Sequence, residues 1–272
     1  GAKVALLGLD PEQLRAVAAE CGAEATAWDA DVTDWQALQR ATDDIAAHYG
    51  RIDVVMANAG IAAAGFIRTI DPAAFEKVIE VNLLGVWRTV RVALPYIIES
   101  KGYVLVVSSM GAIVHIPGNG PYNAAKAAVE AFGNTLRAEV RHFGVRVGVA
   151  HPTWIATDMV NSADEHPVFG PLRRGSLGPL GTTYPVSVAV DAFVAGIERR
   201  ARTIHIPRNL IGIKLIRSLI PLVVELVGRR FIGKADADAA ADVRARGSAA
   251  SAPVGPGGKA ASEGLGPKVS AD

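Results

Sequence analysis

The residues most suggestive of chemistry are a tyrosine and a lysine that stand four positions apart. Tyr122 and Lys126 open a helical pattern, and residues at this spacing share one helix face. A phenol with a pKa of about 10 is a poor base at neutral pH, and a nearby ammonium favours its ionised form. The pair therefore predicts a proton donor and acceptor for carbonyl and alcohol chemistry. On spacing alone, the alternative is an ordinary pair on an exposed helix face.

Further polar residues stand where ligands bind in open α/β sheets. Ser109 follows the predicted strand Tyr103–Ser108, and an Asn-Ala-Gly turn follows the predicted strand Ile52–Ala57. The carboxyl ends of parallel strands form the ligand-binding edge of such sheets. Asn82 lies inside an apolar helix, where asparagine has a poor propensity. It indicates either a polar task or a buried amide with its hydrogen bonds satisfied.

Short apolar strands alternate with longer helical patterns over the first two-thirds of the chain. The predicted strands are Val4–Leu7, Ala23–Trp28, Ile52–Ala57, Tyr103–Ser108, Val145–Ala150 and Thr203–Ile206; the predicted helices are Pro11–Cys21, Thr33–Tyr49, Asp71–Ser100, Tyr122–Phe143 and Val186–Arg200. Continuous apolar strands separated by helices predict a parallel sheet covered on both faces, and hence an α/β fold.

The last third of the chain has a different composition. Pro152–Pro185 is rich in Gly and Pro and predicts a long loop, within which Asn161–Tyr184 is expected to be a mobile substrate lid. Leu210–Phe231 is apolar but is interrupted by charges and a proline, so a docked amphipathic helix pair forming one wall of the pocket is favoured over membrane contact. Residues 233–272 predict a disordered tail.

The bulk composition excludes some classes of partner. The 272 residues carry a formal net charge of +1, which predicts no nucleic-acid binding. The single cysteine, Cys21, cannot form an internal disulfide, and nothing near it suggests a metal site. A reduced, cytoplasmic protein is expected.

In order and spacing, these motifs resemble those of the short-chain dehydrogenase/reductase family, from about Ala2 to Ile206. The family's Tyr-x-x-x-Lys motif matches Tyr122 and Lys126, its catalytic serine matches Ser109, and its helix asparagine matches Asn82. Its Asn-Ala-Gly turn matches Asn58, Ala59 and Gly60, and its Asp-Val pair near adenine matches Asp31 and Val32. Pro152 and Thr157 match the family's segment after the strand Val145–Ala150. Thr153 departs from the glycine usual after that proline.

The resemblance implies a Rossmann-like, doubly wound parallel sheet in three αβα layers and an NAD- or NADP-dependent oxidoreductase. In that family's mechanism Tyr122 exchanges the proton, Ser109 orients the substrate oxygen, Lys126 lowers the pKa of Tyr122 and holds the nicotinamide ribose, and Asn82 supports a relay water. The cofactor contacts implied are Asp31, Val32, Asn58, Ala59, Gly60, Tyr122, Lys126, Pro152, Ile155 and Thr157, the last two at the carboxamide. The choice between NAD and NADP stays open, because Gly8 and Leu9 occupy the selecting positions. The family also implies a homo-oligomer.

One departure from the family affects the whole fold. The chain begins at what resembles the family's second strand, so the glycine-rich turn that receives pyrophosphate is missing. We therefore expect an N-terminally truncated domain over residues 1–232 with a gap in its sheet, and favour a fragment of a longer gene product. The expected substrate is a hydrophobic alcohol or ketone. The alternatives are a non-catalytic or cofactor-impaired relative and a lipid reductase at a membrane surface.

Overall fold

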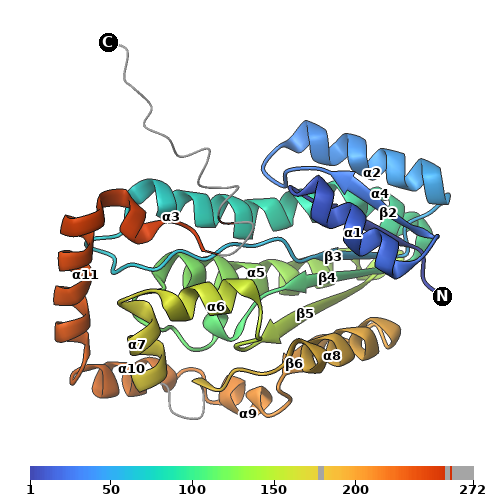
Figure 1. Cartoon of the computed structure of the whole chain (residues 1–272). Coiled ribbons are helices and arrows are strands. Elements are labelled where there is room, and N and C mark those ends of the chain that lie inside the picture. Colours follow the sequence, from blue (N-terminus) through green and yellow to red (C-terminus); the bar gives the residue numbers. More distant parts are fainter. Residues whose placement is uncertain (177–180, 255–257, 259–272) are drawn as a thin grey trace.

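A computed structural model describes residues 1–176, 181–254 and 258, and the described residues form an α/β structure with six parallel strands. The strands are β1 (Val4–Gly8), β2 (Ala25–Asp29), β3 (Val54–Ala57), β4 (Tyr103–Val107), β5 (Arg146–Pro152) and β6 (Thr203–Ile206). All are paired in parallel, as the alternation of strands and helices predicts (Figure 1).

The strands form two sheets rather than one. Strands β1 and β2 pair with each other, and the other four lie in the order β3-β4-β5-β6. No hydrogen bonds join β1 to β3 in the described residues, so the expected interruption of the sheet is confirmed.

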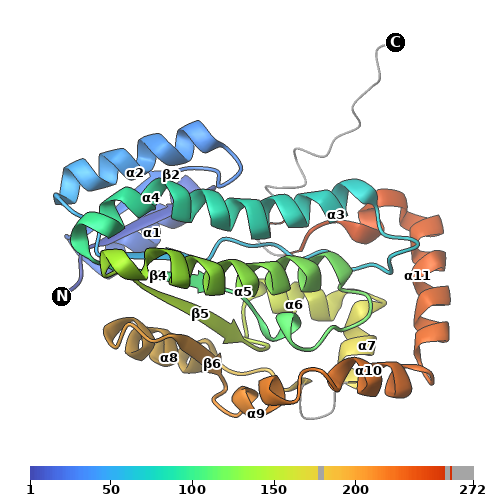
Figure 2. The same ribbon diagram turned by 180° about the vertical axis from the view of Figure 1, so that it is seen from behind.

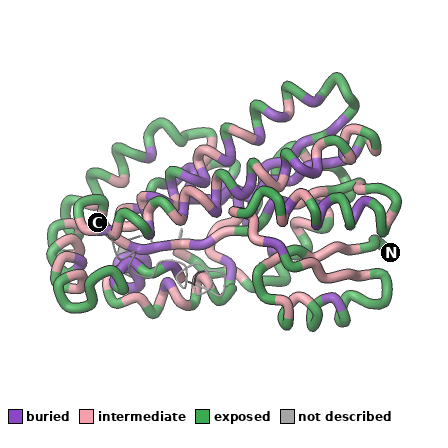
Figure 3. Tube along the Cα trace, turned by 90° about the horizontal axis from the view of Figure 1, so that it is seen from above, coloured by how far each residue is buried: buried purple, intermediate pink, exposed green. Residues whose placement is uncertain are grey.

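Helices cover both faces of the four-stranded sheet. Val104 and Val106 of β4 pack on one face against α4 (Val86–Ser100) and α5 (Gly120–Val140). Tyr103 and Leu105 point to the other face, toward α8 (Val186–Glu198). This alternation along one strand gives the predicted three layers, visible from both sides in Figures 1 and 2. Burial is concentrated along the central segments, and the outer turns of most helices are exposed (Figure 3).

An aspartate caps the N-terminus of each of the first three helices. Asp10 accepts hydrogen bonds from the backbone N–H groups of Glu12 and Gln13, and α1 (Pro11–Cys21) follows with proline at its first position. Asp34 caps α2 (Trp35–Tyr49) in the same way, and Asp71 caps α3 (Pro72–Ile79). The predicted long helix after Asp71 contains a π-helical segment, Glu80–Gly85, between α3 and α4.

The prediction of an irregular Pro152–Pro185 segment is wrong, because it contains α6 (Asp158–Glu165) and α7 (Phe169–Ser176). His166 Nδ1 accepts from the backbone N–H groups of Val168 and Phe169, both at 3.2 Å, and so caps the start of α7. Gly170 and Pro171 are tolerated in α7 because they stand in the first turn of that helix. Residues 177–180 of the expected lid lie outside the described residues.

The C-terminal region confirms one prediction and contradicts another. Leu210–Phe231 forms the expected pair of docked helices, α9 (Leu210–Leu215) and α10 (Ile220–Gly228). The segment expected to be disordered instead begins with α11 (Ile232–Arg246) and a short 3-10 turn, Gly247–Ser251. Its alanines have high helix propensity, and Lys234 pairs with Asp238 one turn later. Residues 255–257 and 259–272 of the expected tail lie outside the described residues, and the division at residue 232 stays a prediction.

Candidate active site

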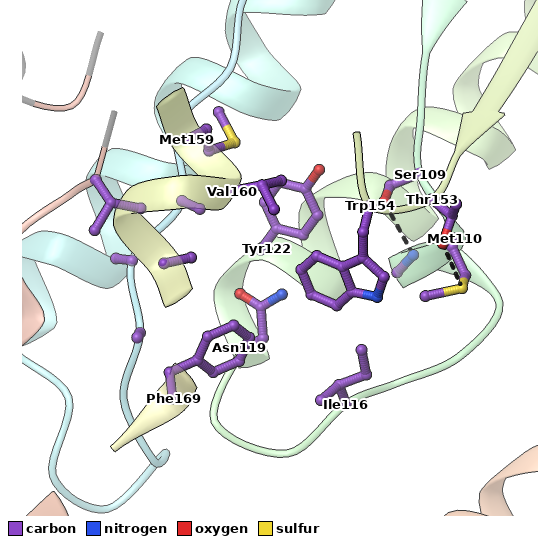
Figure 4. A pocket seen from close by; sticks show the side chains of 16 residues that line it. Ser109, Met110, Ile116, Asn119, Tyr122, Thr153, Trp154, Met159, Val160 and Phe169 are labelled. Carbon is purple, nitrogen blue, oxygen red and sulfur yellow. Dashed lines mark hydrogen bonds between the residues drawn. The ribbon is translucent and has the colours of Figure 1, made fainter. Parts of the chain in front are cut away.

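Ser109 and Tyr122 come together from two elements that follow one another in the chain. Ser109 stands just after β4, where its Oγ accepts from the backbone N–H of Gly111 at 3.1 Å and starts a short 3-10 turn. Tyr122 lies in the first turn of α5. Both side chains reach the pocket drawn in Figure 4. The structure therefore brings these two predicted site residues to one pocket.

Lys126 is buried one turn further along α5. Its Nζ donates to the carbonyl of Val107 at 2.9 Å and lies 5.7 Å from the centre of the Tyr122 ring. Burial lowers the pKa of Lys126 to about 8. Burial also raises the pKa of Tyr122, and the influence of the neighbouring Ser109 only partly opposes it. The pKa shift of the phenol is therefore opposite to the one expected, because desolvation is the largest influence on it.

Asn82 is a fully buried amide in the π-helical segment. Its Nδ2 donates to the carbonyl of Ile61 and its Oδ1 accepts from the N–H of Ile61, each at 2.8 Å. These two bonds hold the loop after β3 against the helix. A Cβ added to Gly60 would lie 3.3 Å from Asn82 Oδ1 and 3.5 Å from Lys126 Nζ, so the three residues adjoin. The satisfied-amide interpretation of Asn82 is confirmed, and its role with a relay water stays a prediction.

A cleft runs over the carboxyl ends of the strands. It has a volume of about 2010 Å³, which includes space open to solvent. Its lining contains all ten residues expected to contact the cofactor: Asp31, Val32, Asn58, Ala59, Gly60, Tyr122, Lys126, Pro152, Ile155 and Thr157. Gly8 and Leu9 also line it, so β1 and β2 contribute to the same cleft as β3, β4 and β5.

The two ends of this cleft differ in how well they fit a dinucleotide. Lys126, Ile155 and Thr157 supply a buried amine and polar groups near Tyr122, as a nicotinamide riboside requires. The N-terminus of α1 does not fit a phosphate, because the Asp10 carboxylate already accepts from its N–H groups. Asp31 likewise accepts from the N–H of Thr33 at 2.7 Å, so its carboxylate has a local structural partner.

A smaller apolar pocket adjoins the cleft (Figure 4). Its volume is about 630 Å³, and its polar side chains near one end include Ser109 and Tyr122. Met110, Ile116, Trp154, Met159, Val160 and Phe169 supply much of its apolar lining. Phe169 belongs to the expected lid, whereas the contribution of Trp154 was not predicted. Its only signal was an aromatic side chain two positions after Pro152.

The expected pocket wall from Leu210–Phe231 needs correction. In the described residues, no side chain of that segment lines the apolar pocket. Leu210 and Ile220 instead pack in a cluster with Met110, Ile116 and Phe169, which themselves line it. The helix pair therefore supports the wall from behind. Val254 lines the pocket directly, although the sequence placed it in a disordered tail.

A second buried group of charges lies on the far part of α5. Glu130 Oε1 is 2.7 Å from Lys214 Nζ and 3.1 Å from Arg217 Nη1, and its Oε2 is 3.3 Å from Nε2 of the fully buried His151. Burial raises the pKa of Glu130, but hydrogen bonds with His151 and Lys214 outweigh it and lower the pKa to about 2. None of these four residues lines either cavity.

The sequence of this chain is similar to those of several known proteins. Residues 1–167 match the family model described as short chain dehydrogenase. An uncharacterized NAD-dependent oxidoreductase of Mycobacterium tuberculosis is 40% identical over 151 residues, covering 55% of this chain and 54% of the relative. A (−)-trans-carveol dehydrogenase of Rhodococcus erythropolis is 34% identical over 153 residues, covering 55% of each chain. The chain thus spans about half the length of these curated relatives.

Solved structures show the same fold. A short chain dehydrogenase/reductase from Burkholderia phymatum, solved in complex with NAD, has a TM-score of 0.69 and 23% identity, covering 81% of this chain and 85% of that chain. A metagenomic short-chain oxidoreductase in complex with NADP has a TM-score of 0.53 and 30% identity, covering 56% of this chain and 71% of that chain.

Proposed function

This chain belongs to the short chain dehydrogenase family, and on that basis we propose that it is an oxidoreductase that transfers hydride between NAD or NADP and a hydrophobic alcohol or ketone. The observation that carries the proposal is the position of Tyr122, which lines both the cleft and the apolar pocket. A phenol at this junction can exchange a proton with an oxygen in the pocket while a cofactor lies in the cleft.

The side chains around Tyr122 have distinct tasks in this proposal. When bound, the nicotinamide supplies or accepts the hydride. Tyr122 donates its proton to the substrate oxygen in reduction and takes it back in oxidation. Ser109 donates a hydrogen bond to the same oxygen and orients it. When protonated, Lys126 favours the ionised phenol, and its amine would hold the ribose in this proposal.

The lining of the pocket supports a hydrophobic substrate. Trp154 and Phe169 are both in the lining, and apolar residues outnumber polar ones there. A relative named as a (−)-trans-carveol dehydrogenase supports an alcohol of this kind as the class of substrate. The direction of the reaction is left open.

A substrate screen tests the proposal. We expect hydrophobic cyclic or long-chain ketones to be reduced with NADH or NADPH, monitored by loss of nicotinamide absorbance, and small polar hydroxy compounds not to be oxidised. Efficient turnover of the polar compounds alone would contradict the proposed substrate class.

Two observations favour a second candidate, a cofactor-impaired relative. The N-terminus of α1 is occupied by Asp10, and strands β1 and β3 are not joined. Titration of the chain with NADH and NADPH, followed by nicotinamide fluorescence, separates the two candidates. Saturable binding supports the oxidoreductase, and no binding at millimolar concentration supports the impaired relative.

A further inference from the structure

The outer face of α9 and α10 carries a dense group of exposed apolar side chains. Nine large apolar residues between positions 211 and 231 are at least a third exposed: Ile211, Leu215, Ile216, Leu219, Leu222, Val223, Leu226, Val227 and Phe231. Leu215 is 81% exposed and Leu226 66%. Contiguous apolar patches of this kind on a protein surface mark an interaction site. We refer to these nine residues as the outer apolar face.

The opposite side of the same helices is fixed to the body of the protein. Leu210, Ile220 and the partly buried Val224 pack in the cluster behind the apolar pocket. Lys214 and Arg217 pair with buried Glu130 on α5. The outer apolar face is therefore presented by anchored helices along one edge of the molecule (Figures 1 and 2). It cannot be buried by a simple rotation of α10 without breaking these contacts.

Basic side chains accompany the outer apolar face. Residues 208–234 contain six basic residues and one acidic residue, Glu225. Two of the basic residues are paired with Glu130; the other four, Arg208, Arg229, Arg230 and Lys234, are exposed. The acidic partners near these four are themselves exposed: Glu225 beside Arg229 and Asp238 beside Lys234. An apolar stripe flanked by lysine and arginine is the pattern of helices that lie in the surface of an anionic membrane.

We propose that the outer apolar face binds the surface of a bilayer that contains anionic lipid. Helix α10 has nine residues, which is too short to span a membrane, so it would lie in the interface. In the part of the chain that the structure describes, Pro72–Ser100 is long and apolar enough to span. Its residues Val86, Val90 and Ile97 are buried in the core between helix and sheet, so that helix is not the membrane contact.

The flanking charge distinguishes a bilayer from a second copy of the chain. A two-fold contact through this face would bring the same patch of each chain together. Arg208, Arg229, Arg230 and Lys234 of the two copies would then gather around one apolar contact with few acidic partners. An anionic lipid surface supplies the opposite charge to all four side chains.

Co-sedimentation of the full chain with lipid vesicles tests this proposal. The vesicles are phosphatidylcholine alone or phosphatidylcholine with phosphatidylglycerol. The test variant is L219S/L222S/L226S, and the matched control is I67S/V188S/V194S, which removes three exposed apolar side chains elsewhere. We expect the wild type and the control to pellet with anionic vesicles, and the test variant to bind more than about tenfold more weakly, because burying one leucine alone changes partitioning by about that factor.

A charge variant and two further readouts complete the design. R229Q/R230Q should weaken binding to anionic vesicles by about fivefold for each charge and leave the weak binding to phosphatidylcholine unchanged. Circular dichroism and nicotinamide binding should be the same in all variants, so failure of the membrane proposal is distinguishable from failure of the oxidoreductase proposal. A wild type that stays in the supernatant with every vesicle would overturn it. So would a dimer in solution that L219S/L222S/L226S dissociates while no variant binds lipid.

Discussion

Tyr122 occupies an environment in which burial disfavours its ionised form, and it lines both cavities. We expect Tyr122→Phe to lower kcat by about 10²–10⁴-fold, because it removes only the proton-exchanging oxygen. Nicotinamide binding and the melting temperature should change little. Tyr96→Phe is the control, since Tyr96 hydrogen-bonds Asp43 at the surface. Near-normal turnover by Tyr122→Phe would remove the tyrosine from the proposed mechanism.

Asn82 acts on the site through the loop that it holds. Asn82→Ala leaves the N–H and the carbonyl of Ile61 without their partners in a fully buried position. We expect the free energy of unfolding to fall by about 2–4 kcal/mol, since each unsatisfied buried group costs about 1–3 kcal/mol. Chemical denaturation measures the loss. Asn82→Asp keeps the acceptor but buries a carboxyl group against the carbonyl of Ile61, so it should also destabilise the protein at neutral pH.

For individual residues, the sequence predicted which side chains lie close together but not the direction of their pKa shifts. The order of Ser109, Tyr122 and Lys126 along one strand and helix was enough to place them together. The pKa shifts of Tyr122 and Lys126 depend on desolvation by the surrounding fold, which spacing along the chain does not record. The partner of Asn82 is a backbone group 21 residues away, which no local pattern records.

At the scale of elements, α5 joins the two buried polar groups. Tyr122 and Lys126 face the cleft, and one turn later Glu130 joins α5 to β5 through His151 and to α9 through Lys214. The folded pKa of Glu130, about 2, is below its unfolded value of 4.5. Its contribution to stability is therefore fully present above pH 4.5 and is lost as the pH falls through about 2.

We expect Glu130→Gln to lower the free energy of unfolding at pH 7 by about 1–3 kcal/mol, because it removes the buried negative charge with which the partly exposed Lys214 and Arg217 pair. Denaturation at several pH values should show the difference from the wild type shrinking below pH 4.5. Glu139→Gln, at an exposed position on the same helix, should have almost no effect. A difference that is constant with pH would show that the charge of Glu130 contributes nothing.

The periodicity of apolar residues predicted the helices and strands well where they alternate regularly. It predicted them poorly in the segments that are rich in glycine and proline or in alanine. Strands β3 to β6 are short apolar runs, and their pairing follows the rule for alternating strands and helices. The sequence did not predict helices α6 and α7, because Gly170 and Pro171 are typical of a loop. The start of α7 is capped by the His166 side chain, a contact that composition does not indicate. Helix α11 was missed because an alanine-rich, charged segment also has the composition of a disordered one.

For the whole molecule, the C-terminal segment connects regions that are distant in the sequence. Helix α11 extends from α10 along one end of the molecule toward α3 (Figures 1 and 2). Arg68 pairs with Asp236 at 2.6 Å, and His166 Nε2 is 3.0 Å from the carbonyl of Ala250. The N–H of Val254 donates to the carbonyl of Ala62 at 2.7 Å, which places the Val254 side chain in the apolar pocket. The pocket is therefore closed by a segment that follows the family-matched residues.

Val254→Pro tests whether this closure determines substrate binding. Proline removes the N–H that bonds the carbonyl of Ala62, so we expect the segment to detach at that point and water to enter the pocket. KM for a hydrophobic ketone should rise by about tenfold, equivalent to the loss of one hydrogen bond and its apolar contact. The binding of nicotinamide should stay unchanged, because Val254 does not line the cleft. Val254→Ala, which keeps the N–H, should raise KM less. If both variants keep the KM of the wild type, the C-terminal segment does not contribute to the substrate pocket.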